Sequence, residues 1–148
     1  PRPEVWAGAR EDVLRMPAGR RRTIRTLATA LDDGLDLGPG ADWSDARSEL
    51  SRIPGLGPWS IESIAMRALG DPDAFVATDL GVRTAAEGLT LHTTQALVER
   101  AERWRPWRAY AVQHLWALGG HAINDLPGPP EAAPPTTVSA SHLTGVTR

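Results

Sequence analysis

The stretch that decides the fold is "SRIPGLGPWSIESIAMRALG", residues 51–70. Two prolines and two glycines fall within five positions, and an amphipathic helix pattern follows directly. A linker that only joins two helices can be longer and more polar. We therefore interpret Gly55 and Gly57 as positions where the backbone itself must approach another group closely.

Apolar residues recur at helical spacing on both sides of this stretch, and no segment alternates with period two. The predicted fold class is all-α. The predicted helices cover residues 18–33, about 44–53, a segment beginning at Trp59, 79–88, 95–104 and 106–118. The residues expected to start or end helices are Asp42 or Ser44, Asp79, Thr93 or Thr94, Pro106, Gly119 and Gly120.

Composition excludes several kinds of chemistry. The 148 residues include no cysteine, which rules out disulfides and thiolate metal ligands. All 16 basic residues are arginine, so no lysine can form a Schiff base. The net charge of −2 does not indicate bulk affinity for nucleic acid, although arginines cluster at 20–25 and 100–108. No apolar run approaches the roughly 18–20 residues of a membrane span.

Two domains of unequal character are expected. Residues 1–124 form a partial helical domain that opens as if an upstream portion were missing. Residues 125–148 are rich in proline, alanine, serine and threonine and lack aromatic residues, so we expect a disordered tail. The histidines have no metal-ligand spacing with carboxylates, which predicts no catalytic metal.

The segment Pro54-Gly55-Leu56-Gly57 between two helices has two interpretations. It can be an ordinary helical hairpin with a proline in the first turn of its second helix. Alternatively, unpaired amides at the N-terminus of that helix can bind a DNA phosphate, which the helix dipole favours. Such contacts carry no sequence information.

Longer stretches favour the second interpretation. "IPGLGPWSIESIAMRALGDPDAFVATDLGVR" and "ERWRPWRAYAVQHLWAL" resemble the helix-hairpin-helix (HhH-GPD) DNA glycosylase superfamily, specifically the bacterial 3-methyladenine DNA glycosylase II (AlkA-type) branch. The resemblance covers about residues 1–120. It implies a helix-hairpin-helix glycosylase bundle that lacks the family's N-terminal part, a small β-containing domain with early helices.

The resemblance also assigns roles to residues. The superfamily's catalytic aspartate falls on Asp79, which the local pattern alone predicts as a helix N-cap; the two roles are compatible because the helix dipole favours the ionised carboxylate. Trp59 stands where bifunctional members carry the lysine that cuts the strand. Trp116 would stack on the base and Trp59 would line its pocket. Ser63 replaces an aromatic residue common in this branch, which thins one wall of that pocket.

The implied function is excision of alkylated purines of the 3-methyladenine and 7-methylguanine type by base flipping and hydrolysis, without strand cleavage or cofactor. Double-stranded DNA is the expected partner of a monomer, or of part of a longer chain, in the bacterial cytoplasm at the nucleoid. The carbonyls of Ile53, Gly55 and Leu56 can hold a monovalent cation. The alternatives are a non-enzymatic DNA-binding module and an inactive fragment of such a glycosylase.

The remaining tryptophans and two further arginines have simpler expected roles. Arg67 and Arg83 can reach phosphates, but a solvated or ion-paired arginine is the default. Core packing is expected for the other four tryptophans, namely Trp6, Trp43, Trp104 and Trp107.

Overall fold

The computed structural model describes residues 2–10 and 14–118, and this part of the chain is helical, without a β-strand. The all-α prediction is thereby confirmed for the described residues. The expected tail, residues 125–148, lies outside them. The elements are α1 (Pro3–Ala7), α2 (Ala18–Asp32), α3 (Trp43–Ser51), α4 (Pro58–Arg67), α5 (Leu80–Gly88), α6 (Thr94–Ala101), a 3-10 turn η1 (Glu102–Trp104) and α7 (Arg108–Leu118).

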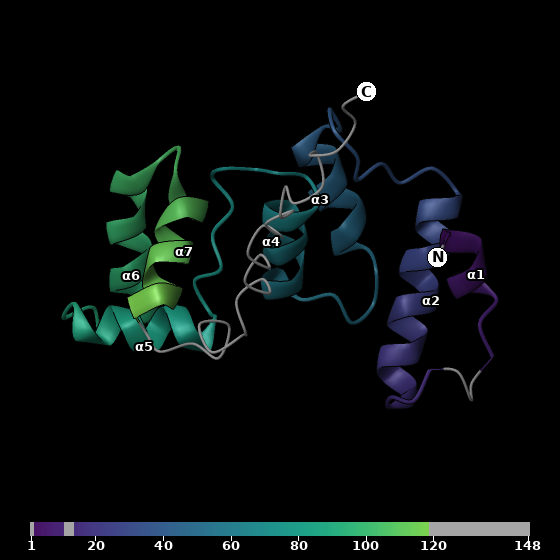
Figure 1. The fold of residues 1–148 in the computed structure, drawn as a ribbon, viewed down its shortest axis with the longest axis horizontal. Coiled ribbons are helices and arrows are strands. Elements are labelled where there is room, and N and C mark those ends of the chain that lie inside the picture. Colours follow the sequence, from purple (N-terminus) through teal and green to yellow (C-terminus); the bar gives the residue numbers. More distant parts are fainter. Residues whose placement is uncertain (1, 11–13, 119–148) are drawn as a thin grey trace, which may run out of the picture.

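The helices form three groups along the long axis of the molecule (Figure 1). α1 packs on α2 at one end, and α3 pairs with α4 in the middle. At the other end α5 runs across the ends of α6 and α7. A long connector, residues 68–79, leads from α4 to α5 and so joins the middle group to the last one.

Two hydrophobic clusters stabilise the middle and last groups. The larger one is built from α5, α6, α7 and the end of the connector: Phe75, Val76, Val82, Ala85, Ala86, Leu97, Ala101, Val112, Leu115 and Trp116. The smaller one is made of Ala46, Ala65, Leu69 and Ala74. Met66 of α4 packs against both, so the hairpin group and the α5–α7 group share an apolar contact.

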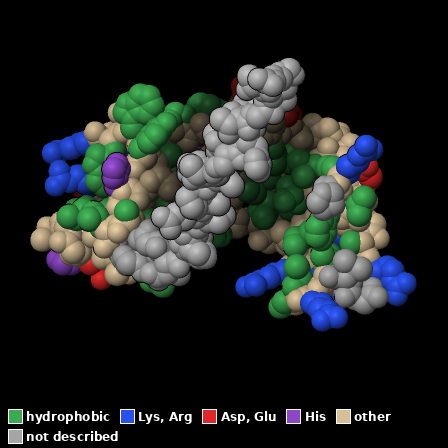
Figure 2. Space-filling view, viewed as in Figure 1, with side chains coloured by type: hydrophobic (Ala, Val, Ile, Leu, Met, Phe, Trp, Pro, Cys, Tyr) green, Lys and Arg blue, Asp and Glu red, His purple; other side chains and the backbone are tan. Residues whose placement is uncertain are grey.

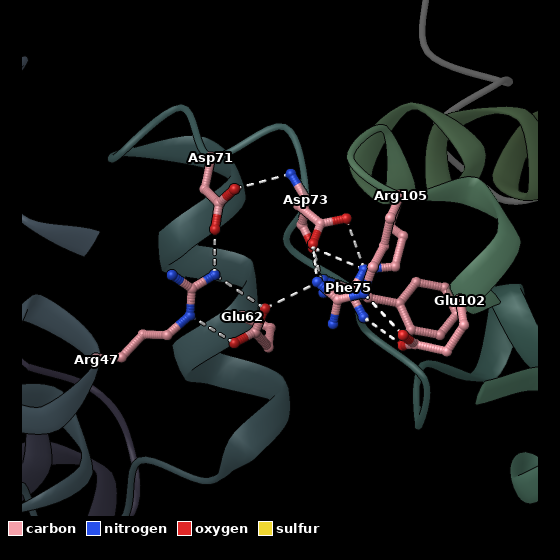
Figure 3. A network of polar contacts seen from close by, with 8 residues as sticks. Arg47, Glu62, Asp71, Asp73, Phe75, Glu102 and Arg105 are labelled. Carbon is pink, nitrogen blue, oxygen red and sulfur yellow. Dashed lines mark hydrogen bonds and ion pairs between the residues drawn. The ribbon is translucent and has the colours of Figure 1, made fainter. Parts of the chain in front are cut away.

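Charged residues join the same two groups (Figure 3). Arg47 of α3 donates to both carboxylate oxygens of Glu62 of α4, at 2.8 and 3.2 Å, and to Asp71 at 2.5 Å. Glu62 also accepts the backbone N–H of Phe75 at 3.1 Å. The hydrogen bond to Glu62 is the main reason that the pKa of Arg47 is raised, and Asp71 adds to it against the cost of desolvation. The α3–α4 pair is therefore tied to the connector.

The connector is held from its other side by a second set of ion pairs (Figure 3). Asp73 accepts from Arg108 at 2.7 and 2.8 Å and from Arg105 at 2.5 Å. Glu102 accepts from the same two arginines at 2.8 and 3.3 Å. Asp73 N–H in turn donates to Asp71, so the two sets form one network. This network fixes the path of the chain that leads to Asp79.

Helix boundaries follow local capping chemistry where caps are present. The side chains of Asp42, Asp79 and Thr93 cap α3, α5 and α6, as predicted from the sequence. The prediction for the last helix is wrong at its start: α7 begins at Arg108, after a cis peptide bond between Arg105 and Pro106. Gly119 and Gly120, expected to end it, lie outside the described residues.

The tryptophans expected in the core divide into two kinds. Trp104 is partly buried against the larger cluster. Trp43 and Trp107 are 41% and 57% exposed, so the expected core packing is wrong for them. Trp107 lies just before α7, and its ring meets that of Tyr110 edge to face on the surface.

The two arginine clusters lie far apart on the molecule. Figure 2 shows basic side chains around the start of α2 at one end of this face and beside α6 at the other. No described helix is long and apolar enough to cross a membrane.

Candidate active site and DNA-facing hairpin

The hairpin between α3 and α4 is held in place by α2. Gly55 adopts a φ of 93°, which favours glycine. A Cβ built on Gly55 would lie 2.2 Å from Oγ1 of Thr23. That hydroxyl donates to the carbonyl of Pro54 at 2.9 Å. The close approach expected at Gly55 is thus explained by a contact inside the chain.

Gly57 behaves differently. Its φ of −92° suits any residue, and a Cβ at this position would meet nothing within 4 Å. α4 begins directly after it, and within the described part of the chain no side chain caps this helix. The fold therefore gives no internal reason for a glycine at 57.

The hairpin carbonyls expected to hold a monovalent cation are only partly engaged. Ile53 O accepts the N–H of Leu56 at 3.2 Å, as in an ordinary turn. The donor set consists of neutral carbonyl oxygens, which suits a hard monovalent ion rather than a transition metal. Among the described residues there is no group of three or more histidine, aspartate or glutamate side chains placed to hold a metal ion.

The second element of the site is Asp79, whose carboxylate is clamped by two indole groups. Nε1–H of Trp116, on α7, donates to Oδ1 at 2.8 Å. Nε1–H of Trp59, on α4, donates to Oδ2 at 2.9 Å. Oδ1 also accepts the backbone N–H of Val82 at 3.0 Å, which caps α5. Two residues far from Asp79 in the sequence, Trp59 and Trp116, are thereby brought to one carboxylate.

These donors determine the protonation of Asp79. Partial burial acts to raise its pKa, because desolvation disfavours the charged form. The hydrogen bonds from Trp116, the N–H of Val82, Trp59 and the N–H of Gly81 outweigh this and lower the pKa below the ordinary value for aspartate. Asp79 is ionised at neutral pH, as an ordinary aspartate is, and its lowered pKa keeps it ionised in more acidic solution.

The two tryptophans differ in exposure. Trp116 is 6% exposed and belongs to the larger hydrophobic cluster, whereas Trp59 is 47% exposed. The guanidinium of Arg67 lies over the ring of Trp116, 5.6 Å from its centroid. Trp59, Ser63 and Arg67 are spaced four residues apart, so they share one side of α4.

The structure brings Asp79, Trp59 and Trp116 together through contacts that the sequence does not predict. The predicted roles are stacking of Trp116 on the base and lining of its pocket by Trp59, and neither role involves the indole N–H groups. An indole offers one donor and no acceptor, so a tryptophan near a carboxylate is a signal for such a bond. The contact of Arg67 with Trp116 was also missed, because it depends on how α4 lies against α7.

Comparison with known proteins now adds to this geometry. No protein-family model matches the chain. The chain is 52% identical over 116 residues, 77% of its length, to the "Probable bifunctional transcriptional activator/DNA repair enzyme AlkA" of Mycobacterium tuberculosis. It is 33% identical over 125 residues, 81% of its length, to DNA-3-methyladenine glycosylase 2 of Escherichia coli.

The chain is homologous to AlkA-type DNA glycosylases. It covers only 23% of the first relative and 43% of the second, so it corresponds to less than half of either protein.

Solved structures show that the chain has the expected fold. The Schizosaccharomyces pombe 3-methyladenine DNA glycosylase Mag1, solved in complex with abasic DNA, matches 78% of this chain and 62% of its own with a TM-score of 0.65 and 23% identity. A DNA-3-methyladenine glycosidase from Bacillus halodurans matches 84% of this chain and 62% of its own, with a TM-score of 0.67 and 22% identity. The helix-hairpin-helix glycosylase fold predicted from the sequence is confirmed.

Proposed function

We propose that this chain carries the catalytic segment of a DNA N-glycosylase that removes alkylated purines of the 3-methyladenine and 7-methylguanine type. The observation that carries the proposal is Asp79, an ionised carboxylate fixed by two indole donors at the start of α5. The names of the relatives, which are 3-methyladenine glycosylases, support the same substrate class.

The chemistry asked of Asp79 is electrostatic. An N3- or N7-alkylated purine carries positive charge, so its glycosidic bond is weak and the base departs without a general acid. As the bond breaks, the sugar develops oxocarbenium character, which a fixed anion stabilises. The same carboxylate can orient the attacking water, since its lowered pKa keeps it deprotonated.

The proposed reaction stops at an abasic site. Strand cleavage by a bifunctional glycosylase requires an amine that attacks the sugar, and the chain contains no lysine. Trp59, which stands where that lysine would be, donates to Asp79 instead. Hydrolysis of the glycosidic bond is the reaction left to this site.

The proposed partner is double-stranded DNA with a flipped base. The amides at the start of α4 would contact a phosphate, and the open space beside Gly57 would allow that approach. Potassium or sodium bound to the carbonyls of Ile53, Gly55 and Leu56 would add positive charge next to the same phosphate.

The test is release of 3-methyladenine and 7-methylguanine from methylated duplex DNA by the chain and by Asp79→Asn. Asparagine keeps the shape and an acceptor oxygen but has no charge. We expect release by the unaltered chain and a loss of roughly 10²- to 10³-fold in the variant, the range seen when a group that stabilises developing charge is removed.

Three results would contradict the proposal in different ways. Equal release by both proteins would remove Asp79 from the reaction. DNA binding by both without any release would favour the non-enzymatic binding module or an inactive fragment. Nicked product from the unaltered chain would contradict the monofunctional reaction.

A further inference from the structure

The guanidinium of Arg67, a planar cation, lies over the ring of Trp116 in this structure. The guanidinium carbon of Arg67 lies 5.6 Å from the ring centroid, within the distance at which a cation is attracted to the electron-rich face of an indole. Guanidinium is flat and delocalised and stacks on aromatic faces. An alkylated purine is also a flat, delocalised cation.

Arg67 is the part of this arrangement that can move. Trp116 is 6% exposed and packs in the larger hydrophobic cluster, so uncovering the ring from the core side would open that cluster. Arg67 lies at the exposed last turn of α4, and no ion pair holds it among those of the described residues. Its side chain can therefore leave the ring of Trp116 without breaking an ion pair among those described.

The neighbours of Arg67 on the same side of α4 are Trp59 and Ser63. Trp59 lies eight residues earlier, where it reaches Asp79. Ser63 lies midway between them and has a much smaller side chain than either. The residue that reaches Asp79 and the residue that lies over Trp116 therefore share one side of α4.

We propose that Arg67 is an intramolecular competitor for the ring face of Trp116, and that its guanidinium occupies the place of a cationic purine and must leave before the base can stack. This inference rests on the proposed function for the identity of the base. Every base has to displace Arg67, so the contact weakens the binding of all bases by the same factor. A cationic base regains an attraction to the ring that a neutral base does not, and so it is the class that can still bind.

The proposal predicts that removing the positive charge of Arg67 strengthens binding. Removing an arginine from a DNA-binding surface normally weakens binding, because a phosphate contact or steering charge is lost. Arg67→Met keeps the length and apolar stem of the side chain but removes the cation. It should strengthen binding of the purine, by roughly two- to thirtyfold, the range that corresponds to a cation–π contact.

The measurement is a titration of the chain with 7-methylguanosine in mildly acidic buffer, where this nucleoside is cationic, followed by quenching of tryptophan fluorescence. Guanosine serves as the neutral probe. Arg83→Met is the matched control, because Arg83 is exposed on α5 near Asp79 and also loses one positive charge. We expect tighter binding of 7-methylguanosine for Arg67→Met and not for Arg83→Met.

Unchanged, weaker or undetectable binding by Arg67→Met would overturn the proposal, as would an equal gain in Arg83→Met, which would indicate general charge repulsion. This titration involves no base release. If Arg67→Met binds the nucleoside more tightly while the unaltered chain releases no base from DNA, the competitor role stands and the glycosylase activity fails. The two proposals are therefore tested separately.

Discussion

The carboxylate of Asp79 caps α5 and also accepts hydrogen bonds from two indole groups. As the N-cap of α5 it accepts a backbone N–H, and this much was predictable because aspartate before an amphipathic helix is a common cap. The indole donors come from residues 20 and 37 positions away. Their convergence depends on tertiary packing, which a single sequence does not display.

The donor from Trp59 can be tested through the pKa of Asp79. Trp59→Phe keeps an aromatic ring but removes the N–H that stabilises the carboxylate, so the pKa of Asp79 should rise. The pKa of Asp79 is lower in the folded state than in the unfolded state. The stability that its ionised carboxylate contributes is therefore fully present above the unfolded-state pKa and is lost as the pH falls through the folded-state pKa. We therefore expect the acid limb of the base-release profile to move to higher pH in Trp59→Phe.

The matched control is Trp43→Phe, because Trp43 is a partly exposed indole on the neighbouring helix α3. Its acid limb should coincide with that of the unaltered chain. If activity is too low for a profile, the carboxyl resonance of Asp79 reports the same pKa by NMR. An unshifted pKa in Trp59→Phe would mean that its hydrogen bond does not control the charge of Asp79.

At the level of the elements, the fold constrains the two hairpin glycines differently. Gly55 meets Thr23 of α2 and has a positive φ, whereas Gly57 has neither constraint. The sequence predicted the tight turn from its prolines and glycines. It could not separate the two glycines, because Thr23 lies 31 residues before Pro54 and nothing in the local pattern links them.

Alanine at each position should therefore have a different effect. Gly55→Ala should destabilise the fold by about 1 kcal/mol or more through its positive φ, with further cost from the contact with Thr23. Gly57→Ala should change the free energy of unfolding by less than about 0.5 kcal/mol. It should nevertheless weaken binding to duplex DNA of any sequence, because the added Cβ would lie in the open space through which we propose that the phosphate approaches.

Urea unfolding and fluorescence anisotropy with two unrelated duplexes measure these effects. Gly57→Ala is the informative variant, since its folded state has room for the methyl group. Unchanged DNA affinity in this variant would show that the phosphate does not approach Gly57. A sequence-dependent loss would instead indicate contacts to the bases.

For the whole molecule, the connector is the segment that ties the middle helix group, α3 and α4, to the last one, α5 to α7. Its Asp71 binds Arg47 of α3 on one side, and its Asp73 binds Arg105, which follows η1, and Arg108 of α7 on the other. The sequence showed acidic residues crowded at 71–79 but not their partners. An acidic run is usually solvated, and only the fold reveals that Asp71 is 5% exposed.

Asp71→Asn should be one of the more destabilising single changes in the chain. Asp71 is buried and bonds Arg47, so the neutral amide weakens a charge-assisted pair in a desolvated place. We expect a loss of about 2 kcal/mol in the free energy of unfolding at neutral pH, in the range for hydrogen bonds to charged groups. Urea titration followed by circular dichroism measures it.

Glu49→Gln is the control, because its pair with Arg52 lies on the surface with both side chains more than half exposed. That change should cost less than about 1 kcal/mol and become smaller in high salt. If Asp71→Asn is no more destabilising than Glu49→Gln, the network is not what joins the helix groups.

The indole clamp on Asp79 offers a spectroscopic marker of the assembled site. The chain has six tryptophans, each of which gives one indole N–H resonance in a nitrogen–proton NMR spectrum. Two of these protons, on Trp59 of α4 and Trp116 of α7, point at one carboxylate, that of Asp79. Both signals should shift together when Asp79 is protonated, and both should collapse together if α4 separates from α7. Two indole signals that shift together would thus report, in solution and without any substrate, whether the geometry of the proposed site is present.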